Sequence, residues 1–110
     1  IENDADFLVN KISGLRIFSD ENDKMNLSIK DVDGSALVIS QFTLCGDLKK
    51  GRRPSFVNAA PPEDGNRLYE YFMSEMKKDG VPIKCGEFGA MMDVELVNNG
   101  PVTFVLNSKD

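Results

Sequence analysis

The segment from Ser35 to Leu44 constrains the fold more than any other part of this sequence. Its centre, Ala36–Ile39, is apolar at consecutive positions, which is typical of a strand that is covered on both faces. An Asp33-Gly34 turn signal precedes it. We therefore predict a strand in the middle of a sheet. These four apolar residues form the longest such run, and a membrane span needs about 18, so we expect no span.

Two segments show the apolar periodicity of helices. The first begins at a cap formed by Asn3 or Asp4 and ends near Gly14. Its apolar residues recur at helical spacing: Phe7, Leu8, Ile12 and Leu15. The second begins at Pro61-Pro62-Glu63 and continues through Lys78. The sequence therefore predicts two amphipathic helices.

Four further segments alternate between apolar and polar residues, as half-buried strands do. Leu15–Ile17 and Met25–Ile29 flank a polar turn, and Met91–Leu96 and Val102–Leu106 flank the turn at 98–101. The strands and helices do not follow a βαβ order, so we predict an α+β fold. With 110 residues, the chain fits one domain over positions 1–110.

The chain contains no histidine, and this restricts its chemistry. Ser-His-Asp and Cys-His catalysis, most zinc sites and imidazole proton transfer are excluded. Aspartates and glutamates are numerous but scattered, and no pair has a spacing typical of glycosidase or metal sites. If the protein is an enzyme, its acid-base chemistry comes from carboxylates, main-chain groups or the substrate itself.

Two cysteines, Cys45 and Cys85, lie far apart in the sequence without further ligands at metal spacing. We expect two free, buried thiols, as in many proteins of a reducing compartment. We predict neither a metal site nor a cofactor.

Four cations stand within five positions of a chain whose net charge is -5: Lys49, Lys50, Arg52 and Arg53. With the neighbouring aromatic Phe56, this loop offers phosphate contacts and a stacking surface for a nucleic-acid end. The alternative is a solvated charged loop without a ligand.

The segment Ser40-Gln41-Phe42-Thr43-Leu44 places polar side chains where the predicted central strand ends, a common location for binding groups. A Ser40 or Thr43 nucleophile would need a carboxylate or lysine as its base. The alternative is that these hydroxyl groups bind only the backbone.

The segment Asn98–Thr103 reads as a type I′ hairpin turn in which Pro101 opens an edge strand. Because only about 5 to 6% of X-Pro bonds in folded proteins are cis, these residues alone favour a trans Gly100-Pro101 bond. A cis bond would instead project main-chain carbonyl groups from the turn in a fixed direction.

Three motifs together resemble the D-aminoacyl-tRNA deacylase family. They are Ser40–Leu44, then Gly51–Phe56 leading into Ala59–Pro62, and Asn98–Thr103. Phe88–Met92 is also similar to the family. The resemblance follows the same order along nearly the whole chain.

The resemblance implies a cytoplasmic homodimer with a mixed, largely antiparallel, barrel-like sheet core and two helices. It implies hydrolysis of the ester that joins a D-amino acid to tRNA, and of glycyl-tRNA mischarged on tRNA-Ala. The implied catalytic segment is Ser40, Gln41, Phe42 and Thr43, with main-chain N–H groups near Phe42 and Thr43 stabilising the oxyanion. For the attacking group, we favour water activated by the ribose 2′-hydroxyl over Thr43, since no histidine activates the threonine.

The resemblance also implies how the substrate is selected. Gly100-Pro101 matches the Gly-cisPro motif, which enters the pocket of the partner subunit and excludes L-amino acids. The substrate-binding set is Gly100, Pro101, Phe56, Ala59, Met92 and Asn98. Lys49, Lys50, Arg52 and Arg53 would lie near the tRNA acceptor stem. The expected partners are aminoacyl-tRNA and a second copy of the chain, with neither DNA nor membrane.

Members of the family carry a further segment ahead of the position that matches Ile1. On this basis we expect residues 1–110 to be the C-terminal three-quarters of a deacylase domain, with an exposed sheet edge. Two alternatives to an active deacylase are a non-catalytic module that binds RNA ends and an inactive fragment of the enzyme.

Overall fold

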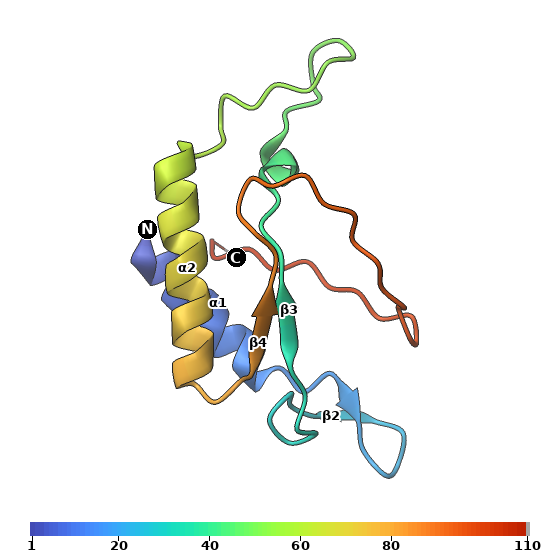
Figure 1. The fold of residues 1–110 in the computed structure, drawn as a ribbon. Helices are drawn as coiled ribbons and strands as arrows, with labels where there is room; N and C mark the ends of the chain where they lie inside the picture. Colours follow the sequence, from blue (N-terminus) through green and yellow to red (C-terminus); the bar gives the residue numbers. More distant parts are fainter. Residues whose placement is uncertain (110) are drawn as a thin grey trace.

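The computed structural model describes residues 1–109, which form two helices, two short strand pairs and long connections (Figure 1). Helix α1 spans Glu2–Gly14 and helix α2 spans Pro62–Lys78, which confirms both predicted helices. α1 begins at Glu2, so neither Asn3 nor Asp4 is its N-cap residue; the carboxylate of Asp4 instead accepts a hydrogen bond from the amino group of Ile1, at 3.3 Å. The chain leaves α2 through Gly80, whose φ of 89° is in the region that favours glycine.

A small core joins the helices to the strands. Val9 of α1, Met76 of α2 and Val81 are buried together, and partly buried Phe72 and Ile83 pack against them. Ala5 and Met73 are also buried. The predicted face of the first helix is only partly right: Ile12 packs against this core, but Ala5 and Val9 are the buried apolar residues of α1 and Phe7 is exposed.

A strand pair forms near the N-terminus as predicted, but only its second strand is where the sequence placed it. The first strand was expected at Leu15–Ile17 and lies instead at Phe18–Ser19. β1 (Phe18–Ser19) pairs antiparallel with β2 (Met25–Leu27). Between them, the carboxylate of Asp20 accepts hydrogen bonds from the backbone N–H groups of Asn22 and Lys24, at 2.9 and 3.0 Å. These bonds fix the turn, and they lower the pKa of Asp20.

The expected central strand is wrong in length and in position. Only Ala36–Val38 forms a strand, β3, and its one partner in residues 1–109 is the parallel strand β4 (Ile83–Cys85). Helix α2 lies in the connection between these strands, because parallel neighbours need a long crossover. The chain therefore contains a β3-α2-β4 unit that the sequence did not reveal, since β4 has only three residues. The fold remains α+β.

The predicted C-terminal hairpin is also wrong, because residues 91–106 are extended but pair with no strand in the described chain. In Figure 1 this orange and red segment runs out from the top of β4 and returns in a wide loop. The alternating apolar side chains have no sheet to cover, so Met91 is 100% exposed and Val105 is 92% exposed. The expected largely antiparallel, barrel-like core is corrected to two separate strand pairs.

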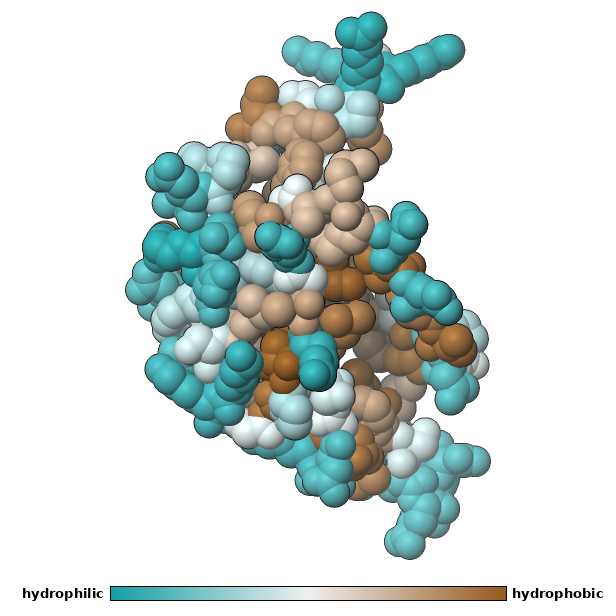
Figure 2. All heavy atoms as spheres, viewed as in Figure 1, coloured by the Kyte–Doolittle hydropathy of each residue, from teal (hydrophilic) through white to brown (hydrophobic). Residues whose placement is uncertain are grey.

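Apolar surface gathers on this flank of the molecule, on the right in Figure 2. The molecule is elongated, with extents of 48 × 30 × 29 Å, and its accessible surface is 8944 Å². A compact monomer of 12.2 kDa exposes about 6,100 Å². The chain therefore presents about half as much surface again as a compact monomer.

Two further expectations concern single features. Cys45 and Cys85 are free, as predicted, but both are exposed, so the prediction that they are buried is wrong. Among residues 1–109, neither helix has the length and apolar character needed to cross a bilayer.

Candidate functional site

A cavity of about 290 Å³ lies at the end of the β3-β4 pair. One wall is Ser40–Phe42, which follows β3. The other wall is Phe88–Met92 with Val94, which follows β4. Because the two strands are parallel, their carboxyl ends lie at the same edge, where ligands bind in open α/β sheets. The fold thus brings together two segments that are far apart in the sequence.

The wall after β3 turns into a short 3-10 helix, η1 (Phe42–Cys45). The ring of Phe42 packs edge-on against Phe56, with centroids 5.0 Å apart. Gly46 lies under this pair, and a Cβ atom there would approach the Phe56 ring to 3.2 Å. The loop that carries Phe56 is therefore anchored to the cavity wall through aromatic packing.

Among residues 1–109, the side chain of Thr43 has one hydrogen-bond partner. The amide Nε2 of Gln41 donates a hydrogen bond to its Oγ1 at 2.6 Å. The backbone N–H groups of Phe42 and Thr43 donate to no other group within residues 1–109. The N–H of Phe42 on this wall, and that of Thr43 directly after it, are therefore available to an oxygen atom of a ligand.

The four cations of the basic loop all lie on the surface: Lys49, Lys50, Arg52 and Arg53. The loop is closed by two backbone hydrogen bonds between Asp47 and Ser55, at 2.7 and 3.0 Å. Gly51 turns the chain at its tip with a φ of 67°. In Figure 1 this green loop projects above the helices, far from the strand pairs. The cations therefore flank the cavity region without lining it.

The turn at 98–103 is held by the side chain of Asn98. Its Oδ1 accepts from the N–H of Val102 at 3.0 Å, and its Nδ2 donates to Thr103 Oγ1 at 2.9 Å. The Gly100-Pro101 bond is cis, so the trans bond favoured by the residues alone is wrong. Gly100 has a φ of 131°, and a Cβ atom there would lie 2.8 Å from Val102 Cγ2. The turn forms the free end of the extended loop in Figure 1, and it does not line the cavity of its own chain.

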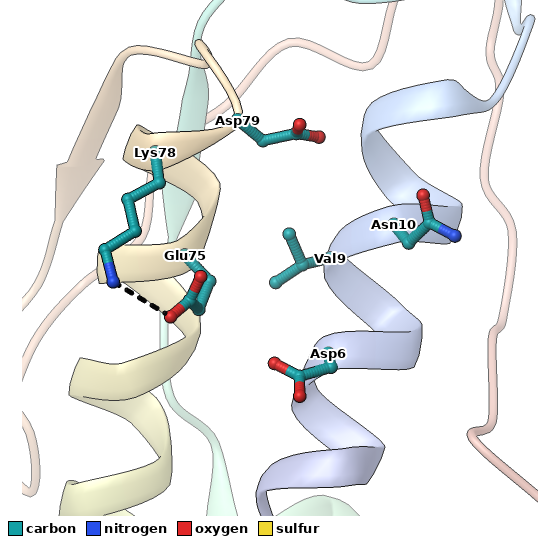
Figure 3. A pocket seen from close by; sticks show the side chains of 6 residues that line it. All are labelled: Asp6, Val9, Asn10, Glu75, Lys78 and Asp79. Carbon is teal, nitrogen blue, oxygen red and sulfur yellow. Dashed lines mark hydrogen bonds and ion pairs between the residues drawn. The ribbon is translucent and has the colours of Figure 1, made fainter.

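A second hollow of about 220 Å³ lies between α1 and α2 and contains none of the predicted site residues (Figure 3). Three carboxylates line it: Asp6, Glu75 and Asp79. Each already has a partner, because Tyr71 donates to Asp6 at 2.6 Å, Lys78 pairs with Glu75 at 3.2 Å and Lys30 pairs with Asp79 at 3.8 Å. No cluster in residues 1–109 is suited to hold a metal ion. Asp6 alone joins the two helices, through Tyr71, whereas Glu75 is paired within α2 and Asp79 is paired with Lys30 after β2.

The sequence profile described as D-Tyr-tRNA(Tyr) deacylase matches residues 1–107. The chain belongs to this family. The resemblance seen in the three sequence motifs is thereby confirmed.

Relatives in this deacylase family are similar over almost the whole chain. A D-aminoacyl-tRNA deacylase from Bacillus cytotoxicus is 58% identical over 108 residues, which are 98% of this chain and 74% of the relative. One from Koribacter versatilis is 57% identical, with 98% and 72% covered. A solved structure, the c-Myc DNA Unwinding Element Binding Protein, superposes with a TM-score of 0.84 at 38% identity and covers 93% of this chain and 70% of that one.

Within this family member, four of the predicted site residues share the cavity: Ser40, Gln41, Phe42 and Met92. The others lie elsewhere, and Phe56 reaches the cavity only through Phe42. Sequence reasoning omitted four consecutive wall residues, Phe88–Met91, from its site. A sequence signal for these residues exists, since Phe88–Met92 resembles the deacylase family. Their side chains are apolar, however, and form no catalytic pattern.

Proposed function

We propose that the protein hydrolyses the ester bond of D-aminoacyl-tRNA, and of glycyl-tRNA mischarged on tRNA-Ala, as a step of chiral proofreading in the cytoplasm. One observation carries the proposal: the chain belongs to the deacylase family and is 58% identical to a relative named D-aminoacyl-tRNA deacylase. The substrate is an aminoacyl-tRNA, and the reaction is the transfer of the aminoacyl group to water.

The proposed site is the cavity at the end of β3 and β4. Ser40, Gln41 and Phe42 form one wall and Met92 belongs to the other, which suits a small aminoacyl group better than a large ligand. Phe56 and Ala59 would contact the terminal adenosine. Lys49, Lys50, Arg52 and Arg53 would bind phosphate groups of the acceptor stem, because exposed cations supply the salt-dependent part of RNA binding.

In the proposed reaction, a water molecule attacks the ester carbonyl carbon, and the carbonyl oxygen becomes negatively charged. The unpaired N–H groups of Phe42 and Thr43 would donate to this oxygen. Thr43 has no base beside it, because an amide neither takes up a proton readily nor carries a charge. We therefore assign activation of the water to the ribose 2′-hydroxyl, which takes a proton from the water as its own proton passes to the ribose 3′-oxygen. The bond between the carbonyl carbon and this oxygen breaks, which releases the free amino acid and the tRNA with its 3′-hydroxyl.

We further propose that two copies of the chain act together. The turn at residues 98–103 lies at the free end of the extended loop and outside the cavity of its own chain, which supports insertion into another chain. A second copy would accept the turn at Gly100-Pro101, which projects from its own chain, into its cavity. The main-chain carbonyl groups of this turn would then exclude L-amino acids, so selectivity would require the dimer.

The activity is tested by incubating the protein with tRNA charged with radiolabelled D-tyrosine and measuring the release of free D-tyrosine over several turnovers. The matched control is the same tRNA charged with L-tyrosine. We expect rapid release of D-tyrosine and slow release of L-tyrosine. Release of D-tyrosine at the spontaneous rate would overturn the proposal, and a single turnover would favour a binding module.

A further inference from the structure

The hydroxyl of Tyr69 donates to backbone carbonyl groups just before each of the two cavity walls. It lies 3.0 Å from the carbonyl oxygen of Val38, at the end of β3, and 3.1 Å from that of Gly86, directly after β4. One hydroxyl hydrogen is shared between the two acceptors, as in other three-centre bonds. Ser40 starts two residues after the first acceptor, and Phe88 stands two residues after the second. The phenol of an α2 residue thus joins the two walls where they begin.

The ring of Tyr69 supports the second wall as well. It packs against Phe88, with ring centroids 5.9 Å apart. One turn earlier in α2, Gly65 leaves room for the same ring, because a Cβ atom there would lie 3.1 Å from Phe88 Cζ. Within the second wall, Met92 packs over Gly86. A Cβ atom on Gly86 would lie 2.8 Å from the sulfur of Met92. Helix α2 therefore supports the second wall at Phe88, through the ring of Tyr69 and the space left by Gly65.

From this geometry we infer that Tyr69 is a positioning residue that sets the separation of the two cavity walls. It touches no substrate; it acts through the carbonyl groups of Val38 and Gly86. The role rests on the proposed function, since the N–H groups of Phe42 and Thr43 stabilise the oxyanion only if the other wall holds the ester against them. Small displacements of reacting groups are costly, and about 1 Å can lower a rate 100-fold.

Burial makes the phenol well suited to this task. The half-buried position of Tyr69 raises the pKa of its hydroxyl, so the group stays protonated and keeps its donor over the whole range in which the enzyme works. Tyr71, two residues later on the same helix, offers a natural comparison. Its hydroxyl donates to Asp6 of α1 and reaches neither strand.

The first test replaces Tyr69 by phenylalanine in the intact protein, with Tyr71→Phe as the matched control. We expect kcat for D-tyrosyl-tRNA to fall about tenfold with KM within about twofold, because misplacement affects the transition state more than binding. Tyr71→Phe keeps its kcat. Hydrogen exchange, followed by mass spectrometry, should become faster in residues 38–44 and 86–92 of Tyr69→Phe while the core of α1 is unchanged.

The second test displaces the wall formed by Phe88–Met92 from the side of α2, by the substitution Gly65→Ala. The added methyl group pushes the Phe88 ring, so kcat should fall although alanine is the better helix former. Gly14→Ala is the control, because a Cβ atom at Gly14 meets nothing within 4 Å.

Each outcome separates the two proposals. Unchanged kcat and unchanged exchange in Tyr69→Phe would overturn the positioning role while leaving the deacylase activity intact. An equal loss in Tyr71→Phe, or faster exchange throughout the chain, would also overturn it, since the effect would then be general. If the unaltered protein releases no D-tyrosine, the proposed function fails, and local exchange alone decides whether Tyr69 holds the walls.

Discussion

The amide of Gln41, on the cavity wall, donates a hydrogen bond at 2.6 Å to the hydroxyl oxygen of Thr43, which lies just beyond that wall. This contact orients the threonine but does not activate it, because the amide cannot accept a proton from the hydroxyl in the reaction.

Thr43→Ala should therefore keep most of the activity. We expect kcat to fall by less than about tenfold, since the main-chain N–H groups remain and the ribose hydroxyl acts on the water. The measurement is single-turnover hydrolysis of D-tyrosyl-tRNA, with Thr43→Ser as the control. A loss of about a thousandfold in the alanine variant, restored by serine, would instead identify Thr43 as the nucleophile.

Gly100→Ala should weaken selectivity more than catalysis. The positive φ of 131° and the close approach of Val102 leave no room for a methyl group, so the turn must change shape. We expect hydrolysis of L-tyrosyl-tRNA to rise relative to that of D-tyrosyl-tRNA. Gly51→Ala is a useful comparison, since Gly51 also has a positive φ but lies in the basic loop. Unchanged rejection of the L-ester would contradict the role of this turn.

Arg52→Ala together with Arg53→Ala should reduce the salt dependence of tRNA binding. Each lost phosphate contact lowers the slope of log affinity against log salt by about 0.7 to 0.9. The control is Lys11→Ala with Lys77→Ala, which removes the same charge from exposed positions on the two helices. Binding measured at several salt concentrations distinguishes them. Equal slopes for the two double variants would show that only net charge matters.

Tyr71→Phe should change how stability depends on alkaline pH. The hydrogen bond to Asp6 raises the pKa of Tyr71 from 10.0 to about 12. The folded state then holds the proton more tightly than the unfolded state, so this contribution is complete below pH 10 and lost as the pH rises through 12. Urea unfolding at pH 8 to 12 should show a smaller loss of stability in the variant. An identical loss would show that the contact does not persist in solution.

The local features of the fold were predictable from the sequence. The spacing of apolar residues predicted both helices, and Asp20–Asp23 marked the turn between β1 and β2. The partner of β3 was not predictable, because β4 has only three residues and its pairing depends on a crossover through α2. The hairpin predicted at 91–106 is absent for another reason. Alternating apolar and polar residues show that a segment can line a sheet, but they do not supply the neighbouring strand.

The candidate site was predictable in part. The resemblance identified Ser40–Phe42 and Met92, which share the cavity. The sequence does not single out Tyr69 within the predicted helix, and its hydroxyl finds its acceptors on two distant backbone carbonyl groups. No periodicity or motif reports such a contact, because it depends on how far α2 stands from the strand ends.

The parallel pairing of β3 and β4 also sets when the cavity can form during synthesis of the chain. A nascent chain that ends before Cys85 has the first wall but not the second, and it has no strand for β3 to pair with. The pocket therefore arises only after the ribosome has added residues 83–92. A deacylase built in this way therefore has no binding site until both wall segments have left the ribosome.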